Sequence, residues 1–439
     1  MNRNENEKVD VFTVGEILDM KLNIPYYQRP YRWSAENHVK QLLKDLSREK
    51  EKEGSKYRIG TVILLLDNEE EKDNEEEKGI LNIVDGQQRL VTLSLILYAL
   101  DEKMHTKVLE QKFEHTDSKN NLKYNFDFIS AYLSNKKEDE KASLKNFILD
   151  RCELLKIELT ELSEAFQLFD SQNARGKALD PADLLKAYHL REMDGFYENE
   201  KRRIVNHWEE AIEKRKLNDV LGNYLFRLRN WKRNEKKYFF SKNHLEEFKG
   251  VTPSKMIREG NSYPYLNKLS SNASSIYYEY DQPILNGKWF FSYVIHYLDL
   301  VDRVNEICES DKNVDLHYYG HWRIGDKRLI KLYKNLLLVY LDRFGEDEYF
   351  NKYRTLLYRW VFITRLEKSQ IRFETILNKV KNQYNPISWI SKWHIPEIDI
   401  MEMKVKRVNS ISKDDSRRDF NDKNSIYKKL LAQEKPTIV

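Results

Sequence analysis

The chain has 439 residues, of which 40% are hydrophobic and 33% are charged, with a formal net charge of +4. This composition excludes a disordered chain, and the length favours two or three domains over one. The longest apolar stretch, residues 90–100, is far shorter than the ~20 residues that cross a bilayer, so no membrane span is expected. The polar N-terminus and the two cysteines favour a cytoplasmic protein without a disulfide framework.

The first hundred residues have the pattern of mixed α and β structure. Apolar spacing predicts helices at 11–20 and 35–48, and Ser34 stands where a capping residue of the second helix belongs. Short β-branched and leucine-rich runs predict buried strands at 58–66 and 80–84. The sequence between them, DNEEEKDNEEEKG, is an acidic low-complexity loop.

Further along the chain, helices dominate the pattern. Residues 87–104 are apolar on almost every side, as in a helix at the centre of a domain. Residues 107–150 are polar with helical character, and a third strand is expected at 154–159. Beyond residue 164, aromatic residues recur at three- and four-residue spacings with few glycines, which predicts a helical C-terminal half.

These elements predict an α+β fold, with a small mixed sheet-and-helix domain followed by a mainly α-helical domain. The domains are expected at 1–195 and 196–408, with a basic mobile tail at 409–439. Residues 401–439 contain ten Lys or Arg against six Asp or Glu, so the chain's excess positive charge lies there.

The junction between the second strand and the buried helix has the features of a phosphate site. Asp85 and Gly86 lead directly into the helix, whose first backbone N–H groups attract anions. Glycine permits close approach to the backbone, while Gln87, Gln88 and Arg89 add side-chain donors and a fixed positive charge. The same residues also suit a turn whose polar side chains face water, and the spacing leaves both interpretations open.

A second candidate element is IPYYQRPYRW at 24–33, which its two prolines hold in an extended conformation. Its aromatic rings could stack on a base while Gln28, Arg29 and Arg32 bind phosphate oxygens. An aromatic segment packed against the sheet, with its arginines on carboxylates, is the alternative.

A third element is FDSQNARGKALDPADLLKAY at 169–188. Asn173 and Arg175 lie in a polar turn, which we interpret as a second loop over the same ligand. Asp180 and Pro181 are start signals for a helix at 182–191. A well-capped turn between domains is the alternative interpretation.

These three motifs occur in the order found in the N-terminal domain family of GmrSD-type modification-dependent restriction proteins, which residues 11–191 resemble. The arrangement is more distantly similar to the ParB and sulfiredoxin superfamily, whose members bind nucleotide phosphates. The resemblance implies a ParB-like nucleotide-binding domain and NTP binding, usually with hydrolysis, in bacterial defence against phage DNA.

The motifs and the resemblance together assign roles to residues. The nucleotide-binding candidates are Gln28, Arg29, Arg32, Gly86, Arg89, Asn173 and Arg175. The catalytic candidates are Asp85, Gln87, Gln88 and Arg89. Asp85 is also the candidate ligand of a Mg²⁺ ion that bridges the phosphates. Tyr26 and Tyr27 correspond to positions at which relatives are thought to sense DNA modification.

The C-terminal half lacks the residues of an HNH nuclease, with which many relatives end. Such a site needs a histidine base and further His or Asn ligands, but the last histidine is His394. His317 and His321 are four residues apart, yet the aromatic and glycine residues between them favour an ordinary turn. DNA cleavage is therefore expected to need a separate nuclease or effector subunit.

Residues 223–240, NYLFRLRNWKRNEKKYFF, interleave basic and aromatic side chains. The candidate DNA contacts are Arg229, Lys232 and Arg233, on a helix that could follow a phosphate backbone. An amphipathic core helix with a solvated basic face is the favoured alternative.

The sequence therefore predicts an NTP-binding and NTP-hydrolysing component of an anti-phage or modification-dependent restriction system. A non-catalytic NTP-loaded sensor and a DNA-binding adaptor are the alternatives. The expected partners are a nucleotide with Mg²⁺, phage or modified DNA, and an effector subunit or further copies of this chain.

Overall fold

The computed structural model describes most of the chain, and its residues divide into two compact units. The first unit comprises 1–191 and 197–205, and the second comprises 192–196 and 206–439. The described residues are 8–25, 28–52, 54–66, 79–113, 115–160, 180–193, 198–213, 216–252, 278–310, 314–381, 385–390, 405, 407–408, 411 and 418–434.

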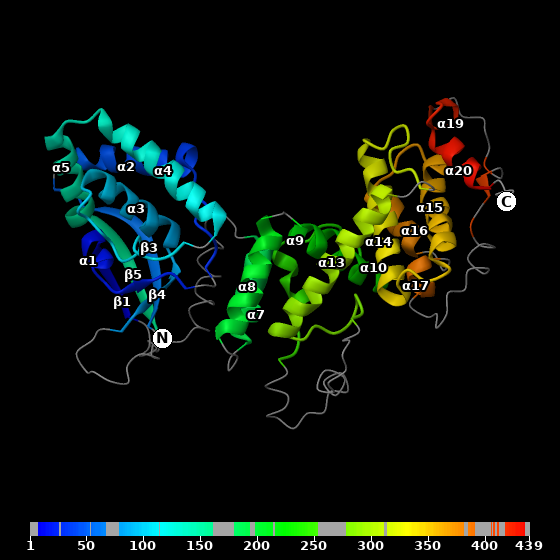
Figure 1. Ribbon diagram of the computed structural model, residues 1–439, viewed down its shortest axis with the longest axis horizontal. Coiled ribbons are helices and arrows are strands. Elements are labelled where there is room, and N and C mark those ends of the chain that lie inside the picture. Colours follow the sequence, from blue (N-terminus) through cyan, green and yellow to red (C-terminus); the bar gives the residue numbers. More distant parts are fainter. Residues whose placement is uncertain are drawn as a thin grey trace, which may run out of the picture. The chain divides into compact units, whose positions relative to one another are not determined.

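The first unit is built on a five-stranded mixed sheet with strand order β1-β5-β3-β4-β2 (Figure 1). The central strand β3 pairs parallel with β5 and antiparallel with β4; β1 pairs antiparallel with β5, and β2 pairs parallel with β4. The strands are β1 (Lys8–Thr13), β2 (Leu22–Asn23), β3 (Tyr57–Leu66), β4 (Leu81–Asp85) and β5 (Cys152–Leu159). The three predicted strands correspond to β3, β4 and β5, and the predicted α+β fold is confirmed.

Helix α3 (Gln87–Leu100) packs with the sheet in the main core of this unit, with α4 (Thr116–Ser134) beside it (Figure 1). Leu90, Val91 and Leu93 are fully buried, as expected for a helix that is apolar on almost every side. The other helical elements are α1 (Val14–Leu18), a π-helical turn (Ala35–Val39), α2 (Lys40–Lys50), α5 (Glu138–Asn146), a second π-helical turn (Phe147–Arg151) and α7 (Pro181–Arg191).

The helix predicted at 11–20 is shorter than expected, because the chain up to Thr13 belongs to strand β1. Val11 pairs with Leu155 of β5, so these residues belong to the sheet although their apolar spacing also suits a helix. Thr13 then caps α1: its Oγ1 accepts from Glu16 N (3.2 Å), and Glu16 Oε2 accepts from Thr13 N (2.7 Å).

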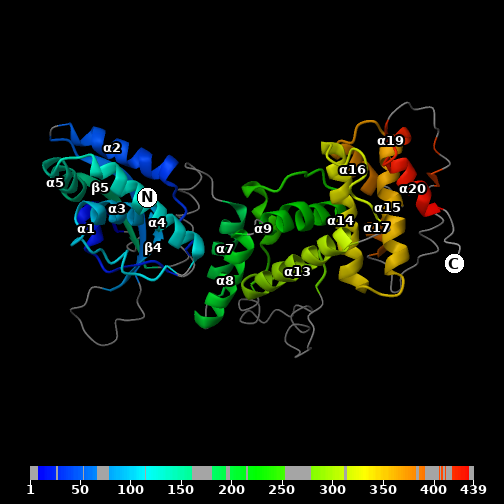
Figure 2. The ribbon, with the colours of Figure 1, turned by 45° about the horizontal axis from the view of Figure 1, so that its top comes forward.

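The described part of the second unit is mainly helical, as predicted. Helix α14 packs against α13 and α15 (Figure 2), and the stacked rings of Tyr340 and Tyr353, 4.0 Å apart, belong to this core. The helices are the end of α8 (Glu198–Glu213), α9 (Lys216–Asp219), a π-helical segment (Val220–Leu225), α10 (Phe226–Lys232), a 3-10 segment (Lys242–Phe248), α13 (Lys288–Ser310), α14 (Ile324–Phe344), α15 (Phe350–Glu367), α16 (Phe373–Lys381), α17 (Pro386–Ile390), α19 (Arg418–Asn421) and α20 (Ile426–Glu434). None of the helices described is both long enough and apolar enough to cross a membrane.

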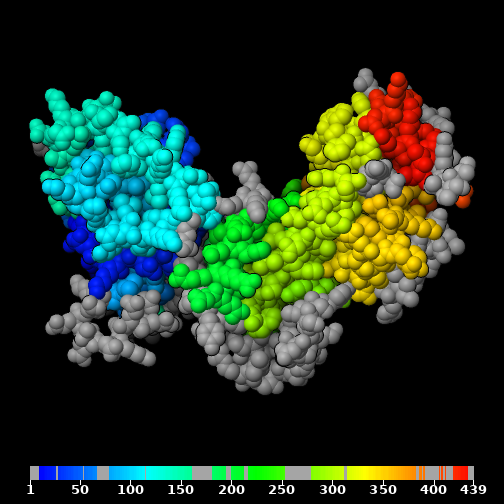
Figure 3. Space-filling view, in the orientation of Figure 1, coloured from blue at the N-terminus to red at the C-terminus, as the bar shows by residue number. Residues whose placement is uncertain are grey.

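Residues 418–434 differ from the mobile tail expected at 409–439. Helix α20 packs on α15, and its Ile426 and Leu430 side chains are fully buried. Lys429 forms an ion pair with Asp315 (2.6 Å). The space-filling view shows these C-terminal residues, in red, against the yellow-green segment that precedes α14 (Figure 3). Apolar residues on one side of α20 therefore anchor a segment whose overall composition is polar.

Candidate functional site

Gly86 alone connects the end of β4 to the start of α3, and its backbone has the left-handed φ of +96°. A Cβ atom at this position would lie 2.9 Å from Val62 Cγ1 of β3. Only glycine satisfies both the conformation and the contact without strain. The turn therefore starts α3 directly at the end of β4, as the phosphate-site interpretation requires.

Among the described residues, no side chain caps the N-terminus of α3. The backbone N–H groups of Arg89 and Leu90 are already bonded to Gly86 O, at 3.1 and 3.0 Å. A helix N-terminus has a partial positive charge and backbone donors that favour an anion. The first turn of α3 is therefore electrostatically suited to a phosphate group.

Arg89 lies in a half-buried position beside strand β3. Its Nη1 donates to Thr61 O (2.8 Å), and it makes no ion pair with any residue that the structure describes. Burial lowers the pKa of Arg89, and the negative charge of Asp85 works in the opposite direction. An arginine stays charged even so, and a buried charge without a close counter-ion is costly. This energetic cost favours an anion beside Arg89.

Gln87 is 5% exposed, and its Oε1 atom is buried without a hydrogen-bond partner in the described structure. An unpaired buried acceptor costs about 1–3 kcal/mol. A ligand that brings a donor, such as a hydroxyl group or a water bound to it, would remove this cost. Gln87 therefore supplies an acceptor in a turn that otherwise offers donors.

Asp85, the last residue of β4, is half-buried, and the described residues give its carboxylate no hydrogen bond or ion pair. It attracts Arg89 electrostatically. Carboxylate oxygen is a hard ligand that Mg²⁺ accepts, and such sites use one or two carboxylates together with substrate phosphates. Among the residues described, no group of three candidate metal ligands occurs, so a metal here would depend on the nucleotide for its other ligands.

The carboxamide of Gln88, a predicted catalytic residue, is bonded to the backbone of the preceding motif. Its Oε1 accepts from the backbone N–H groups of Arg32 (2.7 Å) and Trp33 (3.2 Å), and its Nε2 donates to Pro30 O (3.1 Å). The side chain is 7% exposed, and its carboxamide is committed to the backbone of 30–33. Gln88 therefore positions the QRPYRW segment against the start of α3.

The QRPYRW segment divides between the core and the surface. Tyr31 is fully buried, and its hydroxyl bonds to Thr92 Oγ1 (2.7 Å) and to Asn125 Nδ2 (2.9 Å). Gln28 Nε2 donates to two carbonyl oxygens at the end of β4, at 2.8 and 2.7 Å. Arg29 is exposed, whereas Arg32 is half-buried. The packing alternative thus holds for Tyr31 and Gln28, whereas Arg29 is accessible to solvent.

Four of the predicted site residues lie outside the described part of the chain: Tyr26, Tyr27, Asn173 and Arg175. Residues 67–78 of the acidic loop and His394 lie outside it too. The helix-start signal after the third motif is confirmed, because α7 begins at Pro181 and Asp180 Oδ1 accepts from Ala182 N (3.0 Å).

The basic residues predicted to bind DNA all have partners within the second unit. Arg229 is 8% exposed and donates to Tyr280 O (3.2 Å) and Gln282 O (2.8 Å). Arg233 forms ion pairs with Glu235 and Glu247. The core-helix alternative is therefore correct for Arg229, because this helix turns that side chain into the protein.

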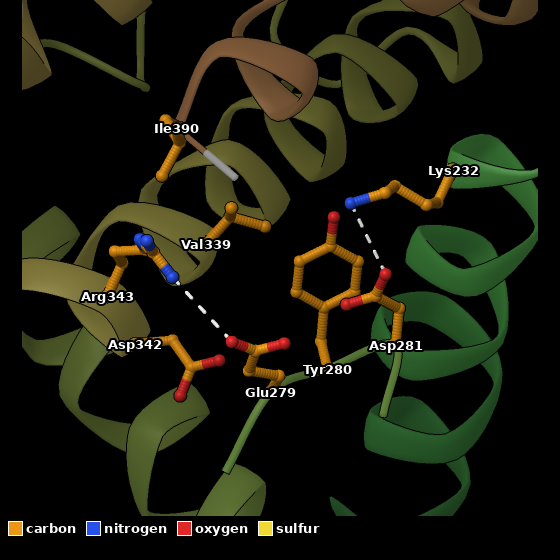
Figure 4. Close-up of a pocket in the computed structure, with 8 residues that line it drawn as sticks. All are labelled: Lys232, Glu279, Tyr280, Asp281, Val339, Asp342, Arg343 and Ile390. Carbon is orange, nitrogen blue, oxygen red and sulfur yellow. Dashed lines mark ion pairs between the residues drawn. The ribbon is translucent and has the colours of Figure 1, made fainter. Parts of the chain in front are cut away.

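Lys232 lines a cavity of about 50 Å³ that also borders α14 and α17. Figure 4 shows Lys232 directed toward Asp281, at 3.3 Å, and Arg343 toward Glu279, at 3.6 Å. Both basic side chains of this cavity are thus neutralised by carboxylates. The cavity lies between the segment 278–281 and its neighbouring helices, and the Lys232 side chain at its border is exposed.

Two family models match the chain, one for each half. Residues 14–190 match the GmrSD restriction endonuclease, N-terminal domain, and residues 200–419 match a family of unknown function, DUF7834. No curated protein matches the chain. The mixed sheet and the β4–α3 junction thus belong to a GmrSD-type N-terminal domain, as the three motifs predicted. The chain belongs to the DUF7834 family, whose model covers half of its length.

Proposed function

We propose that this chain is a restriction-system component that binds a nucleoside triphosphate at the β4–α3 junction. The observation that supports this most is Arg89, a half-buried guanidinium without an ion-pair partner among the described residues, at an uncapped helix N-terminus. The GmrSD-type N-terminal domain supports the restriction context.

In this proposal Arg89 and the first backbone N–H groups of α3 hold the phosphates. Gln87 Oε1 accepts from a ligand hydroxyl or a bound water, and Arg29 binds phosphate at the edge of the site. Asp85 would hold Mg²⁺, which would neutralise phosphate charge when bound. Gln88 and Gln28 act indirectly, by holding the 28–33 segment against the junction.

A nucleotide-gated sensor is the second candidate function, and the hydrogen bonds of Gln88 favour it. They join the start of α3 to the backbone of 30–33, so a nucleotide that shifts this turn would also shift the segment. With Gln88 committed to positioning, Asp85 and Gln87 are left to orient a water for hydrolysis. We therefore expect slow turnover, with nucleotide occupancy as the signal to an effector subunit.

The test is calorimetric titration of the purified chain with each of the four NTPs, with and without Mg²⁺. Arg89→Ala should weaken binding by about 1.5–3 kcal/mol, the usual contribution of a hydrogen bond to a charged group. Arg48→Ala is the matched control, because Arg48 is exposed and pairs only locally, with Asp45 and Glu49. Unchanged affinity in folded Arg89→Ala would contradict the proposal, and a phosphate-release assay separates slow hydrolysis from sensing alone.

A further inference from the structure

Two arginines of the second unit lie against one aromatic ring. The Arg328 guanidinium is 4.2 Å from the centroid of Phe373, and that of Arg227 is 5.7 Å from the same centroid. Arg328 donates to Ile371 O (2.8 Å), which fixes its position. Cation–π contacts orient a guanidinium without neutralising it, so both positive charges persist.

The surroundings of Arg227 and Arg328 lack a neutralising carboxylate. Neither forms an ion pair with a described residue. No acidic residue is among those that line the cavity of about 10 Å³ between them. Lys237 also lines this cavity, but it is already paired with Glu235 (2.7 Å) and Glu247 (3.0 Å). The nearest acid in electrostatic terms, Asp219, is already paired with Lys331 at 2.8 Å.

The positive charge of Arg227 is energetically unfavourable at this position. Burial lowers the pKa of Arg227, and repulsion from Arg328 lowers it further. Like charges held together in a half-buried place are unfavourable unless an anion joins them. The two arginines therefore differ from the two cations in Figure 4, each of which has a carboxylate.

An exposed aromatic side chain lies at the same place. Phe239 is 63% exposed, and its ring makes an edge contact with Phe373 at 4.9 Å. Tyr238 contacts Phe373 from the neighbouring position at 5.4 Å. A hydrophobic ring held this far in solvent by an aromatic neighbour has an accessible face on which a planar group can stack.

We propose that Arg227, Arg328 and Phe239 form a binding site for single-stranded nucleic acid. The cavity has room for about one water-sized group, so one phosphate oxygen enters between the guanidiniums. The adjacent base lies outside and stacks on Phe239. A duplex keeps its bases stacked on each other, so it cannot use Phe239 in this way. The site lies in the second unit and is independent of the nucleotide proposed for the β4–α3 junction.

The test is fluorescence anisotropy with a labelled oligo(dT), using the whole chain. Replacing both arginines, by Arg227→Gln with Arg328→Gln, should weaken binding at least tenfold and reduce the salt dependence by about 0.7 for each phosphate that is no longer bound. Phe239→Ala should weaken binding at least about fivefold, as expected when one base no longer stacks. The matched controls, Arg303→Gln and Trp322→Ala, remove an exposed arginine and an exposed aromatic ring elsewhere in the unit and should bind normally.

A second measurement needs no variant. Ultraviolet cross-linking of an oligonucleotide containing 5-iododeoxyuridine should label the peptide with Tyr238 and Phe239 in the wild-type chain. The proposal would be overturned if the cross-link labelled another peptide, or if the double-arginine variant bound the oligonucleotide as tightly as the wild type. It would also be overturned if duplex DNA bound as tightly as the single strand and Phe239→Ala left duplex binding unchanged. Arg89→Ala should retain oligonucleotide binding, which keeps this test separate from that of the NTP site.

Discussion

The guanidinium of Arg89 lies against the backbone of Gly60, where a Cβ atom would be 3.0 Å from Arg89 Cζ. Gly60 also has a φ of +151°, which side-chain-bearing residues rarely adopt. The central strand β3 thus has no side chain at position 60, and the guanidinium of Arg89 lies in the space that a side chain would occupy. The position of Arg89 is determined by β3 as much as by its own helix.

Gly60→Ala should therefore destabilise the chain by about 1–3 kcal/mol, because it adds backbone strain and a contact with Arg89. The measurement is urea unfolding of the wild type, Gly60→Ala, Arg89→Ala and the double variant. Removal of Arg89 should relieve part of the cost, so the two changes should be non-additive. Strict additivity would show that Gly60 matters for its backbone conformation alone.

Gln88→Ala should destabilise the chain by about 2–4 kcal/mol, since it breaks three hydrogen bonds to the backbone of 30–33. Gln41→Ala, which removes an exposed carboxamide bonded only to Asp45, should cost less than about 0.5 kcal/mol. Chemical unfolding measures both. A Gln88→Ala protein of normal stability that had lost nucleotide turnover would instead restore a catalytic role for Gln88.

Deletion of residues 68–78 should leave folding and nucleotide binding intact. Leu66 of β3 pairs directly with Leu81 of β4, so the strand ends are already adjacent. The deletion leaves a three-residue connection that contains Gly79, a length common in β-hairpins. Thermal melting and NTP titration check this, and a large loss in either would mean that the acidic segment has a structural or binding role.

Burial raises the pKa of the Cys152 thiol to about 12. At pH values above about 8.5, the usual pKa of a cysteine, the thiol of the unfolded chain loses its proton while the thiol of the folded chain keeps it. The contribution of the protonated Cys152 thiol to the free energy of unfolding is complete below about pH 8.5 and is lost as the pH rises toward 12. Between pH 8 and 10.5, the unfolding free energy of Cys152→Ala should fall less steeply than that of the wild type. At pH 8 a thiol reagent should leave Cys152 unmodified until the chain is denatured.

The chain alone should leave modified and unmodified phage DNA uncut in the presence of NTP and a divalent metal ion. Its last histidine is His394, so the C-terminal region has no later histidine for an HNH site. Gel electrophoresis after incubation with the pure chain tests this. Robust cutting that His394→Ala abolishes would make the chain a complete restriction enzyme.

The β4–α3 junction could be predicted because its parts are consecutive in the chain. A leucine- and isoleucine-rich run, a glycine and a long apolar segment are local signals, and they placed β4, Gly86 and α3 correctly. Strand β1 was missed because its pairing with β5 joins residues about 145 positions apart, beyond the range of any local pattern. The packing of α20 on α15 was missed for the same reason.

The roles of neighbouring side chains were decided by tertiary structure. Gln88 and Arg89 follow each other, but a helix turns successive residues by about 100°, so one holds the 30–33 backbone and the other faces β3. The same rotation buries Arg229 and leaves Arg227 at a cavity with Arg328, a residue about a hundred positions away. Local sequence patterns were enough to assign these residues to their helices and strands. The accessibility of each side chain to a ligand depends on the segments that the fold packs against its helix face.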